Sequence, residues 1–166
     1  MTDSVGWTVL HYAAVDSDEE TVQVMLASIS EEMRFTLLSM EDNDKWTPIH
    51  IACIRRNSEM LEMMMRLITV EMRYKLLQLP VYSLYTPLHR SASLGRTQCI
   101  RVIADSVSSQ QLIHLLRITD KYRTTPLQLA AELDEHAAVE LLQEYQTKAL
   151  IDVALQQTDP SGSCII

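Results

Sequence analysis

A seven-residue pattern recurs four times in the chain, and its copies begin 39 residues apart, at threonines 8, 47, 86 and 125. The copies are Thr8-Val9-Leu10-His11-Tyr12-Ala13-Ala14, Thr47-Pro48-Ile49-His50-Ile51-Ala52-Cys53, Thr86-Pro87-Leu88-His89-Arg90-Ser91-Ala92 and Thr125-Pro126-Leu127-Gln128-Leu129-Ala130-Ala131. Self-similarity at one fixed period is typical of a solenoid, in which each unit buries its apolar face only against its neighbours. The repeat therefore predicts one domain over 1–166, with units at about 8–46, 47–85, 86–124 and 125–163.

Each unit carries the signals of about three helices. Thr followed by Pro favours a helix start, because Thr caps free backbone N–H groups and Pro is tolerated at the first helical position. A second helix follows, with apolar residues at the i, i+3, i+4 spacing of a core-facing side, as at Leu61, Met64 and Met65. A third, short helix is predicted because good capping residues recur one period apart, at Ser30, Thr69, Ser108 and Thr147. The fold class predicted is all-α.

These patterns resemble the ankyrin repeat, and the resemblance covers essentially the whole chain. The T-P-L-H-x-A-A opening and the V-V-x-L-L-L-type helix that follows it carry the likeness. The resemblance implies a right-handed ankyrin-type α-solenoid of four units. It also implies that each repeat histidine bonds loop backbone and links adjacent units. The structural motif positions are then Thr8, His11, Thr47, His50, Thr86, His89, Thr125 and Gln128.

The sequence departs from the ankyrin pattern in three respects. The period exceeds the usual 33 or so residues, so the β-turn fingers should be short or partly displaced. The glycine that normally ends the first helix survives only at Gly95. Ser17, Arg56 and Asp134 replace it, at about 1 kcal/mol each if the left-handed conformation is kept. Residues 159–166 resemble the start of a fifth unit. We expect a slice of a longer array, with further ankyrin repeats at either end, or a last unit that meets another chain.

Composition narrows the function classes. Three scattered cysteines without a C-x-x-C pair favour a reducing, intracellular compartment, for which we expect the cytoplasm. No apolar run approaches the roughly 18 residues of a membrane span, and the N-terminus lacks the pattern of a secretory signal. The net charge is −8, yet residues 45–124 hold 12 basic and 5 acidic residues. An acidic chain with a basic middle is a poor candidate for nucleic-acid or membrane binding and suits a protein partner.

No catalytic constellation is present in the sequence. It contains no H-E-x-x-H and no G-x-S-x-G, and its three glycines cannot supply a glycine-rich phosphate loop. The in-register histidines could form a ladder for metal or acid–base chemistry. Gln128 occupies the fourth position of that ladder, however, and is a weak metal ligand. Cys53 replaces a small alanine and is expected to be buried and inert. We therefore expect no enzyme activity, catalytic residue, metal, cofactor or small-molecule ligand.

The residue before each repeat threonine is aromatic in three units, at Trp7, Trp46 and Tyr85. In ankyrin-like folds this position tends to face the concave surface, and aromatic residues are over-represented among binding hot spots. The alternative is that the rings stack on each other and on the third helix as extended core. Further candidates on the same face, which make its middle basic and suit an acidic or amphipathic peptide, are Asp16, Arg55, Arg56, Arg90 and Leu94.

These features predict a non-catalytic scaffold that binds a partner protein through its concave face. Stacked units would hold separate side chains on one preformed surface, so little conformational entropy is lost on binding. Two alternatives stay open: a structural spacer within a longer ankyrin array, and a substrate-recruiting or regulatory part of a larger multidomain enzyme. A spacer would tolerate replacement of its surface residues, whereas a binding module would not.

Overall fold

The chain folds into helices throughout the part that the computed structural model describes, which comprises residues 2–16 and 19–157, without the side chain of residue 21. This part contains eleven α-helices, one 3-10 turn and no extended strand. The helices are α1 (Val9–Asp16), α2 (Glu19–Ala27), α3 (Glu31–Ser39), α4 (Pro48–Arg55), α5 (Ser58–Arg66), α6 (Val70–Leu77), α7 (Pro87–Ser93), α8 (Thr97–Asp105), α9 (Ser109–Arg117), α10 (Pro126–Glu132) and α11 (His136–Gln156), and the 3-10 turn is η1 (Tyr82–Leu84). The predicted all-α fold is confirmed.

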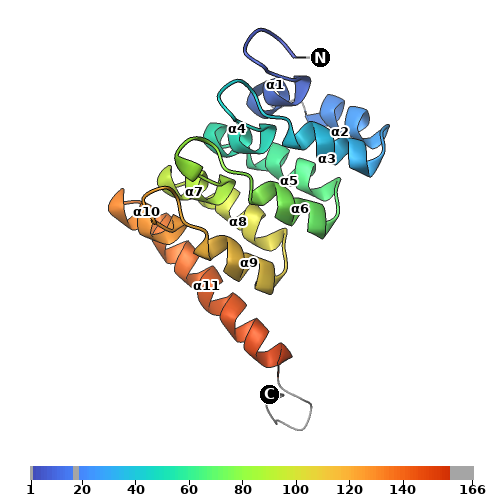
Figure 1. Cartoon of the computed structure of the whole chain (residues 1–166). Helices are drawn as coiled ribbons and strands as arrows, with labels where there is room; N and C mark the ends of the chain where they lie inside the picture. Colours follow the sequence, from blue (N-terminus) through green and yellow to red (C-terminus); the bar gives the residue numbers. More distant parts are fainter. Residues whose placement is uncertain (1, 17–18, 158–166) are drawn as a thin grey trace.

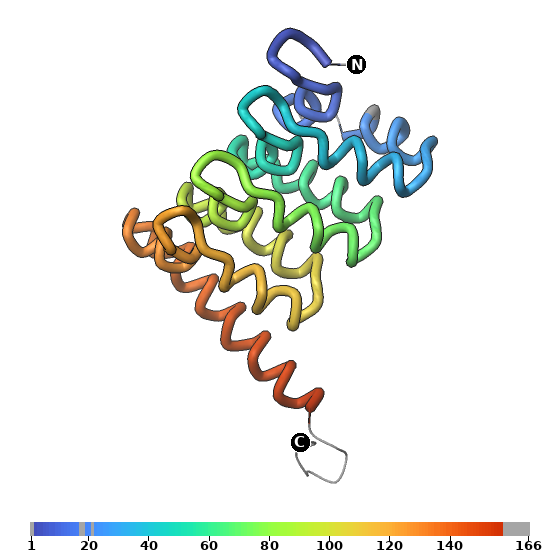
Figure 2. The backbone as a smooth tube through the Cα atoms, in the orientation of Figure 1, coloured from blue at the N-terminus to red at the C-terminus, as the bar shows by residue number. Residues whose placement is uncertain are grey.

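The helices repeat in layers along the array (Figure 1). Helices α1, α4, α7 and α10 form a first row, in which each packs on the next. Helices α2, α5 and α8 form a second row behind it, and α3, α6 and α9 form a third row. The turns that enter the units stack on one side of the array, beside the first row (Figure 2). This arrangement is the predicted ankyrin-type α-solenoid.

Capping residues start several helices where the sequence predicts, although the Thr47 side chain makes no cap bond at the start of α4. The side chains of Thr86 and Thr125 accept a hydrogen bond from the backbone N–H three residues further on, and a proline follows each of them. The same bond opens the third-row helices α3, α6 and α9, where the caps are Ser30, Thr69 and Ser108. Each cap satisfies a backbone donor that a helix start leaves free.

Unit four departs from the prediction, because α11 runs through the position at which a third helix should begin. Thr147 lies inside α11, where its hydroxyl donates to the Gln143 carbonyl at 2.8 Å. The first three units carry a β-branched residue at the bend, namely Ile29, Ile68 and Val107. Unit four has Gln146 there, which is a good helix former. The predicted third helix of unit four is therefore wrong: its second and third segments merge. Residues 159–166 and Ser17 lie outside the described residues.

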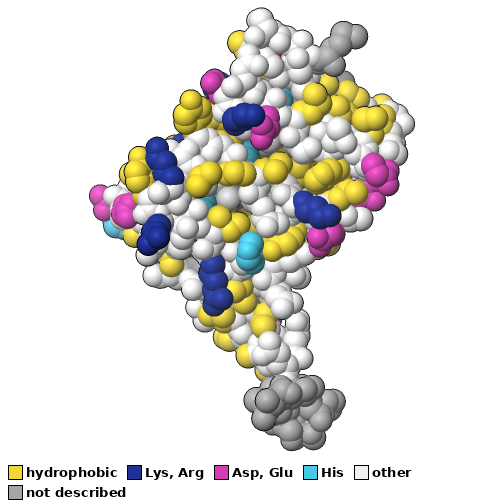
Figure 3. Space-filling model, in the orientation of Figure 1, with side chains coloured by type: hydrophobic (Ala, Val, Ile, Leu, Met, Phe, Trp, Pro, Cys, Tyr) yellow, Lys and Arg dark blue, Asp and Glu magenta, His cyan; other side chains and the backbone are white. Residues whose placement is uncertain are grey.

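The core runs through all four units without a break. Leu10, Ile49, Leu61 and Leu88 are at most 1 % exposed, and each buried side chain of this size stabilises the fold by about 1.5–3 kcal/mol. The far half of α11 is the exception: Leu150, Ile151 and Leu155 are exposed, and apolar side chains gather there in Figure 3. No helix of residues 2–16 and 19–157 has the length and apolar character needed to cross a membrane.

Two arginines tie neighbouring units together in the interior of the array. Arg34 donates to the carbonyls of Leu26 (2.6 Å) and Leu67 (2.9 Å), which lie at the ends of α2 and α5. Arg73, one period later, donates to Met65 (2.6 Å) and Ile68 (3.0 Å), and to Ser106 (3.3 Å) of the next unit. Each guanidinium therefore satisfies free carbonyls at the ends of two successive second-row helices, where the helix dipole also favours a cation.

The left-handed conformation at the end of the first helix is kept by residues other than glycine. Arg56 and Asp134 have φ values of 63° and 57°, close to the 61° of Gly95. A residue other than glycine in this conformation destabilises the folded state by roughly 1–2 kcal/mol relative to glycine, which adopts it without steric strain. The expected strain at these positions is therefore present in the fold.

A second left-handed position recurs in the turns, at the fourth residue of each: Gly6, Lys45, Leu84 and Arg123 have φ values of 83°, 70°, 62° and 66°. Leu84 is half exposed and gains little from burial there. We expect Leu84→Gly to raise the free energy of unfolding by about 1 kcal/mol, because relief of the strain exceeds the extra freedom of the unfolded chain. Urea unfolding measures this, with Tyr82→Gly, at a negative φ in the same turn, as the control. A stability unchanged or lowered by Leu84→Gly would contradict the strain.

Candidate protein-binding surface

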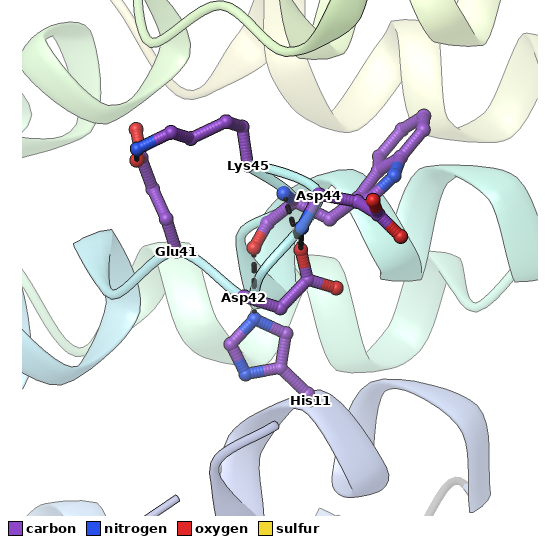
Figure 4. Close-up of polar contacts among 6 residues, drawn as sticks. His11, Glu41, Asp42, Asp44 and Lys45 are labelled. Carbon is purple, nitrogen blue, oxygen red and sulfur yellow. Dashed lines mark hydrogen bonds and ion pairs between the residues drawn. The ribbon is translucent and has the colours of Figure 1, made fainter. Parts of the chain in front are cut away.

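Each unit is entered through a compact five-residue turn. The turns run over Asp3–Trp7, Asp42–Trp46, Val81–Tyr85 and Asp120–Thr124, and in each the first N–H donates to the fifth carbonyl, at 2.8–3.1 Å. In the three turns that begin with Asp, Oδ1 also accepts from the third and fifth N–H groups. Asp42, for example, accepts from Asp44 (2.9 Å) and Trp46 (2.8 Å), as Figure 4 shows. The aromatic residue that ends a turn is thus placed by backbone bonds.

Two of the repeat histidines, His11 and His89, join a first-row helix to the next turn. Nδ1 of His11 lies 2.8 Å from the Thr8 hydroxyl and accepts the Thr8 N–H at 3.1 Å. The ring proton therefore sits on Nε2, which donates to the Trp46 carbonyl at 2.9 Å (Figure 4). His89 repeats the arrangement and reaches the Thr124 carbonyl at 3.1 Å. These contacts give the histidines a structural role.

Gln128 replaces the histidine in unit four and performs half of its task. Its side-chain oxygen accepts the Thr125 N–H at 2.9 Å, as Nδ1 of the histidine does in other units. The backbone N–H of Gln128 donates to the Thr125 hydroxyl oxygen at 3.3 Å, which completes the helix start. In unit two the Thr47 hydroxyl lies 2.8 Å from Nδ1 of His50, as the equivalent hydroxyls do in units one and three.

His50 differs from its equivalents in having no acceptor of good geometry for Nε2, although the Tyr85 backbone faces it. Burial lowers the pKa of His50 to about 3, and the positive charge of Arg90 adds to the effect. The imidazole is therefore neutral at physiological pH. A buried neutral histidine makes stability sensitive to pH.

Trp7 is bound into the first turn and the one after it. Its indole N–H donates to Oδ2 of Asp42 at 3.0 Å, and its ring lies 6.0 Å from that of His11 and 4.9 Å from that of Tyr12. The Tyr12 hydroxyl in turn donates to the Asp3 carboxylate. Trp7 is half-buried, and its polar group already has a partner within the chain. It therefore serves stability more than recognition.

Trp46, Arg90 and Tyr85 form one group across units two and three. The guanidinium carbon of Arg90 lies 4.8 Å from the centre of the Trp46 ring and 5.3 Å from that of Tyr85. Each ring also contacts the histidine of its own unit, at 6.0 Å for Trp46–His50 and 5.8 Å for Tyr85–His89. All three side chains of this group, which we call the Trp46–Arg90–Tyr85 cluster, are half-buried. The rings thus pack on the core with one edge and leave another edge at the surface.

The other candidates lie at the ends of the first-row helices. Asp16, Arg55 and Arg56 are exposed, and Leu94 is half-buried. No hydrogen bond, ion pair or ring contact of the described residues joins them to the Trp46–Arg90–Tyr85 cluster. The structure therefore brings Arg90 together with Trp46 and Tyr85. The candidates at the helix ends do not belong to this cluster.

The side chains that could support chemistry are sequestered or dispersed. Among residues 2–16 and 19–157, no three His, Cys, Asp or Glu side chains are arranged to hold a metal ion. Cys53 is fully buried, as predicted, and its thiol contacts that of Cys99. The hydrogen bond to Cys99 and burial both raise the pKa of the Cys53 thiol, which keeps it protonated and disfavours nucleophilic attack.

The stacked helical units and their turns define a helical-repeat solenoid whose first-row side presents aromatic and basic side chains. Residues 1–75 match the family model of ankyrin repeats in three copies. Residues 1–75 are thus ankyrin repeats, and the later units repeat the geometry of their entering turns and first helices. No curated protein matches the chain. Ankyrin repeats are generally protein–protein interaction modules, and the family is generally non-catalytic.

Two features of the fold had signals in the sequence to which the repeat analysis assigned no structural role. Asp3, Asp42 and Asp120 stand in register at the first turn position, and Val81 replaces the aspartate in unit three. Because Trp7 donates to Asp42, this replacement removes the matching acceptor for Trp46. Arg34 and Arg73 also stand one period apart, which indicates a repeated task.

Proposed function

We propose that this chain is a scaffold that binds a partner protein through the surface formed by its first-row helices and turns. The observation that carries the proposal is the Trp46–Arg90–Tyr85 cluster, which offers two aromatic rings and a guanidinium at the centre of that surface. Trp, Tyr and Arg are the residues most enriched at interface hot spots. The basic segment 45–124 favours an acidic or amphipathic partner segment.

The fold supports this function by holding the cluster rigidly before a partner arrives. The turn bonds hold Trp46 and Tyr85 through the backbone, and His11 and His89 join units one and two and units three and four. A preformed surface loses little conformational entropy on binding, which favours affinity. The free buried thiols Cys53 and Cys99 fit a reducing compartment, so we expect the partner to be intracellular.

Quantitative capture from a cell extract tests the proposal. We expect the wild type to retain a specific protein that Trp46→Ala/Tyr85→Ala loses by roughly 30-fold or more, since truncated hot spots cost about 2 kcal/mol each. The matched control is Met33→Ser/Val70→Ser, which alters exposed apolar residues of the third-row helices and should capture as the wild type does. Circular dichroism melts confirm that each variant folds.

A structural spacer is the second candidate, and the exposed apolar face of α11 favours it. Ile151 and Leu155 are exposed, whereas Leu112 and Leu116, which stand one period earlier, are buried. If the folded Trp46→Ala/Tyr85→Ala variant captures the same proteins in the same amounts, the spacer explanation replaces the binding proposal.

A further inference from the structure

Arg90 is held in one orientation by the two aromatic residues that flank it. Its guanidinium carbon lies within 6 Å of both ring centres, at 4.8 Å for Trp46 and 5.3 Å for Tyr85. A guanidinium over an aromatic face is stabilised by the ring, most strongly where the pair is desolvated. The two rings thus restrict the position of the guanidinium, while its terminal nitrogens are left for other interactions.

The N–H groups of Arg90 find no acceptor in the described part of the chain. The guanidinium makes neither a hydrogen bond nor an ion pair there, and its Nε is buried without a partner. The two terminal nitrogens are not buried, so they remain open to solvent. Burial lowers the pKa of Arg90, and the one group that raises it is Tyr85. Arg90 is therefore a half-desolvated cation with no carboxylate beside it.

Two other half-buried arginines of the fold, Arg34 and Arg73, each donate to three backbone carbonyls. Arg96 also has a buried Nε without a partner, but one of its terminal nitrogens donates to the Ile54 carbonyl at 3.5 Å. Desolvating a charged donor without a partner is unfavourable. Among the half-buried arginines of the described residues, Arg90 is thus the one that makes no hydrogen bond, and its terminal N–H groups are free to meet an acceptor of a partner.

The flanking Trp46 offers a second open donor. The indole N–H of Trp7 donates to Asp42 at 3.0 Å, but the equivalent position for Trp46 is Val81, which has no acceptor. No hydrogen bond from the Trp46 indole to a described residue is present. The group around Arg90 therefore presents hydrogen-bond donors from two side chains, and it presents a single positive charge.

We propose that the Trp46–Arg90–Tyr85 cluster is a preformed receptor for one carboxylate side chain, an Asp or Glu on an extended segment of the partner protein. A carboxylate matches the planar fork of a guanidinium and carries one negative charge. One unpaired guanidinium balances that charge, whereas a phosphate dianion would need a second cation. The inference rests on the proposed function and adds to it the chemistry of the central contact.

Selection from a random 12-residue peptide library fused to a phage coat protein by its C-terminus tests the inference, because such peptides have no free terminal carboxylate. We expect the wild type to enrich peptides that share one acidic position. Changing that residue to its amide should weaken binding to the wild type by roughly 10- to 100-fold. The same change should have little effect on binding to Arg90→Gln, and Arg90→Lys should give an intermediate result.

The outcomes separate the two proposals. One outcome is enrichment of peptides that share no acidic position, that bind Arg90→Gln as well as the wild type, and that no longer bind Trp46→Ala. This outcome would overturn the carboxylate receptor but would still support the proposed binding surface. If the enriched peptides instead share a run of several acidic residues that contribute equally to binding, the proposal that the cluster binds one carboxylate is overturned. Failure to enrich any peptide would contradict both proposals. Thermal melts show whether Arg90→Gln is folded, and Arg90→Lys provides the same test if it is not.

Discussion

Replacing Arg73 with Met is expected to lower the free energy of unfolding by about 2–4 kcal/mol. Met keeps most of the apolar stem but removes the donors that reach Met65 (2.6 Å), Ile68 (3.0 Å) and Ser106 (3.3 Å). Hydrogen bonds to charged groups contribute about 1.5–3 kcal/mol each, and the freed carbonyls would regain part of this from water. Urea unfolding followed by circular dichroism measures the loss.

The matched control is Arg66→Met, which removes an arginine with the same stem from the helix that Arg73 caps. Arg66 lies 3.7 Å from Glu62 in an exposed pair, and such pairs contribute about 0–1 kcal/mol. Arg73→Lys keeps the charge without the planar fork and should fall between the two. If Arg73→Met costs no more than Arg66→Met, the link between units two and three does not stabilise the array.

The stability of the protein is expected to fall by about 2 kcal/mol between pH 7.5 and pH 5 because of His50. The unfolded chain binds a proton at His50 near pH 6.5, whereas the folded chain binds it only near pH 3. Between these values the unfolded state holds more protons, so acid favours unfolding. The loss amounts to about 1.4 kcal/mol for each pH unit below 6.5. His89, whose pKa burial also lowers, acts in the same direction.

Urea unfolding at a series of pH values tests this expectation, with His50→Gln as the matched variant. Gln occupies the equivalent position in unit four and does not titrate, so the variant should lose the dependence that His50 contributes. The carboxylates with lowered pKa values, Asp3 and Glu32, lose their contribution only at lower pH and leave this window clear. A wild-type stability that is flat from pH 7.5 to 5 would show that His50 is protonated in the folded protein.

The repeat made much of the fold predictable because many helix starts depend on local capping chemistry. Thr86, Thr125 and Ser108 cap helices where the period places them, since the bond needs only a hydroxyl three residues before a free N–H. Thr147 shows the limit of this reasoning. A capping residue cannot start a new helix where the preceding helix continues. Gln146, a good helix former, allows α11 to continue through Thr147.

The sequence predicted which aromatic residues lie in the candidate site, but it did not predict that Arg90 contacts them. The period placed Trp46 and Tyr85 in one column, but Arg90 belongs to the helix of unit three, and only the packing of α4 on α7 sets it between the two rings. Among the described residues the three rings do not stack on one another, as the core alternative required; they contact the repeat histidines, and Trp46 and Tyr85 also contact Arg90. Their role as a binding surface stays a prediction. Each ring contacts a histidine on one side and the surface on another.

Amide hydrogen exchange of the protein with and without its captured partner tests the central claim, that the first-row helices and turns are the binding surface. The account predicts protection in the turns 42–46 and 81–85 and in α4 and α7, with exchange unchanged in α3, α6 and α9. Protection confined to the third-row helices or to the far half of α11 would contradict the account, and would assign recognition to a different side of the array.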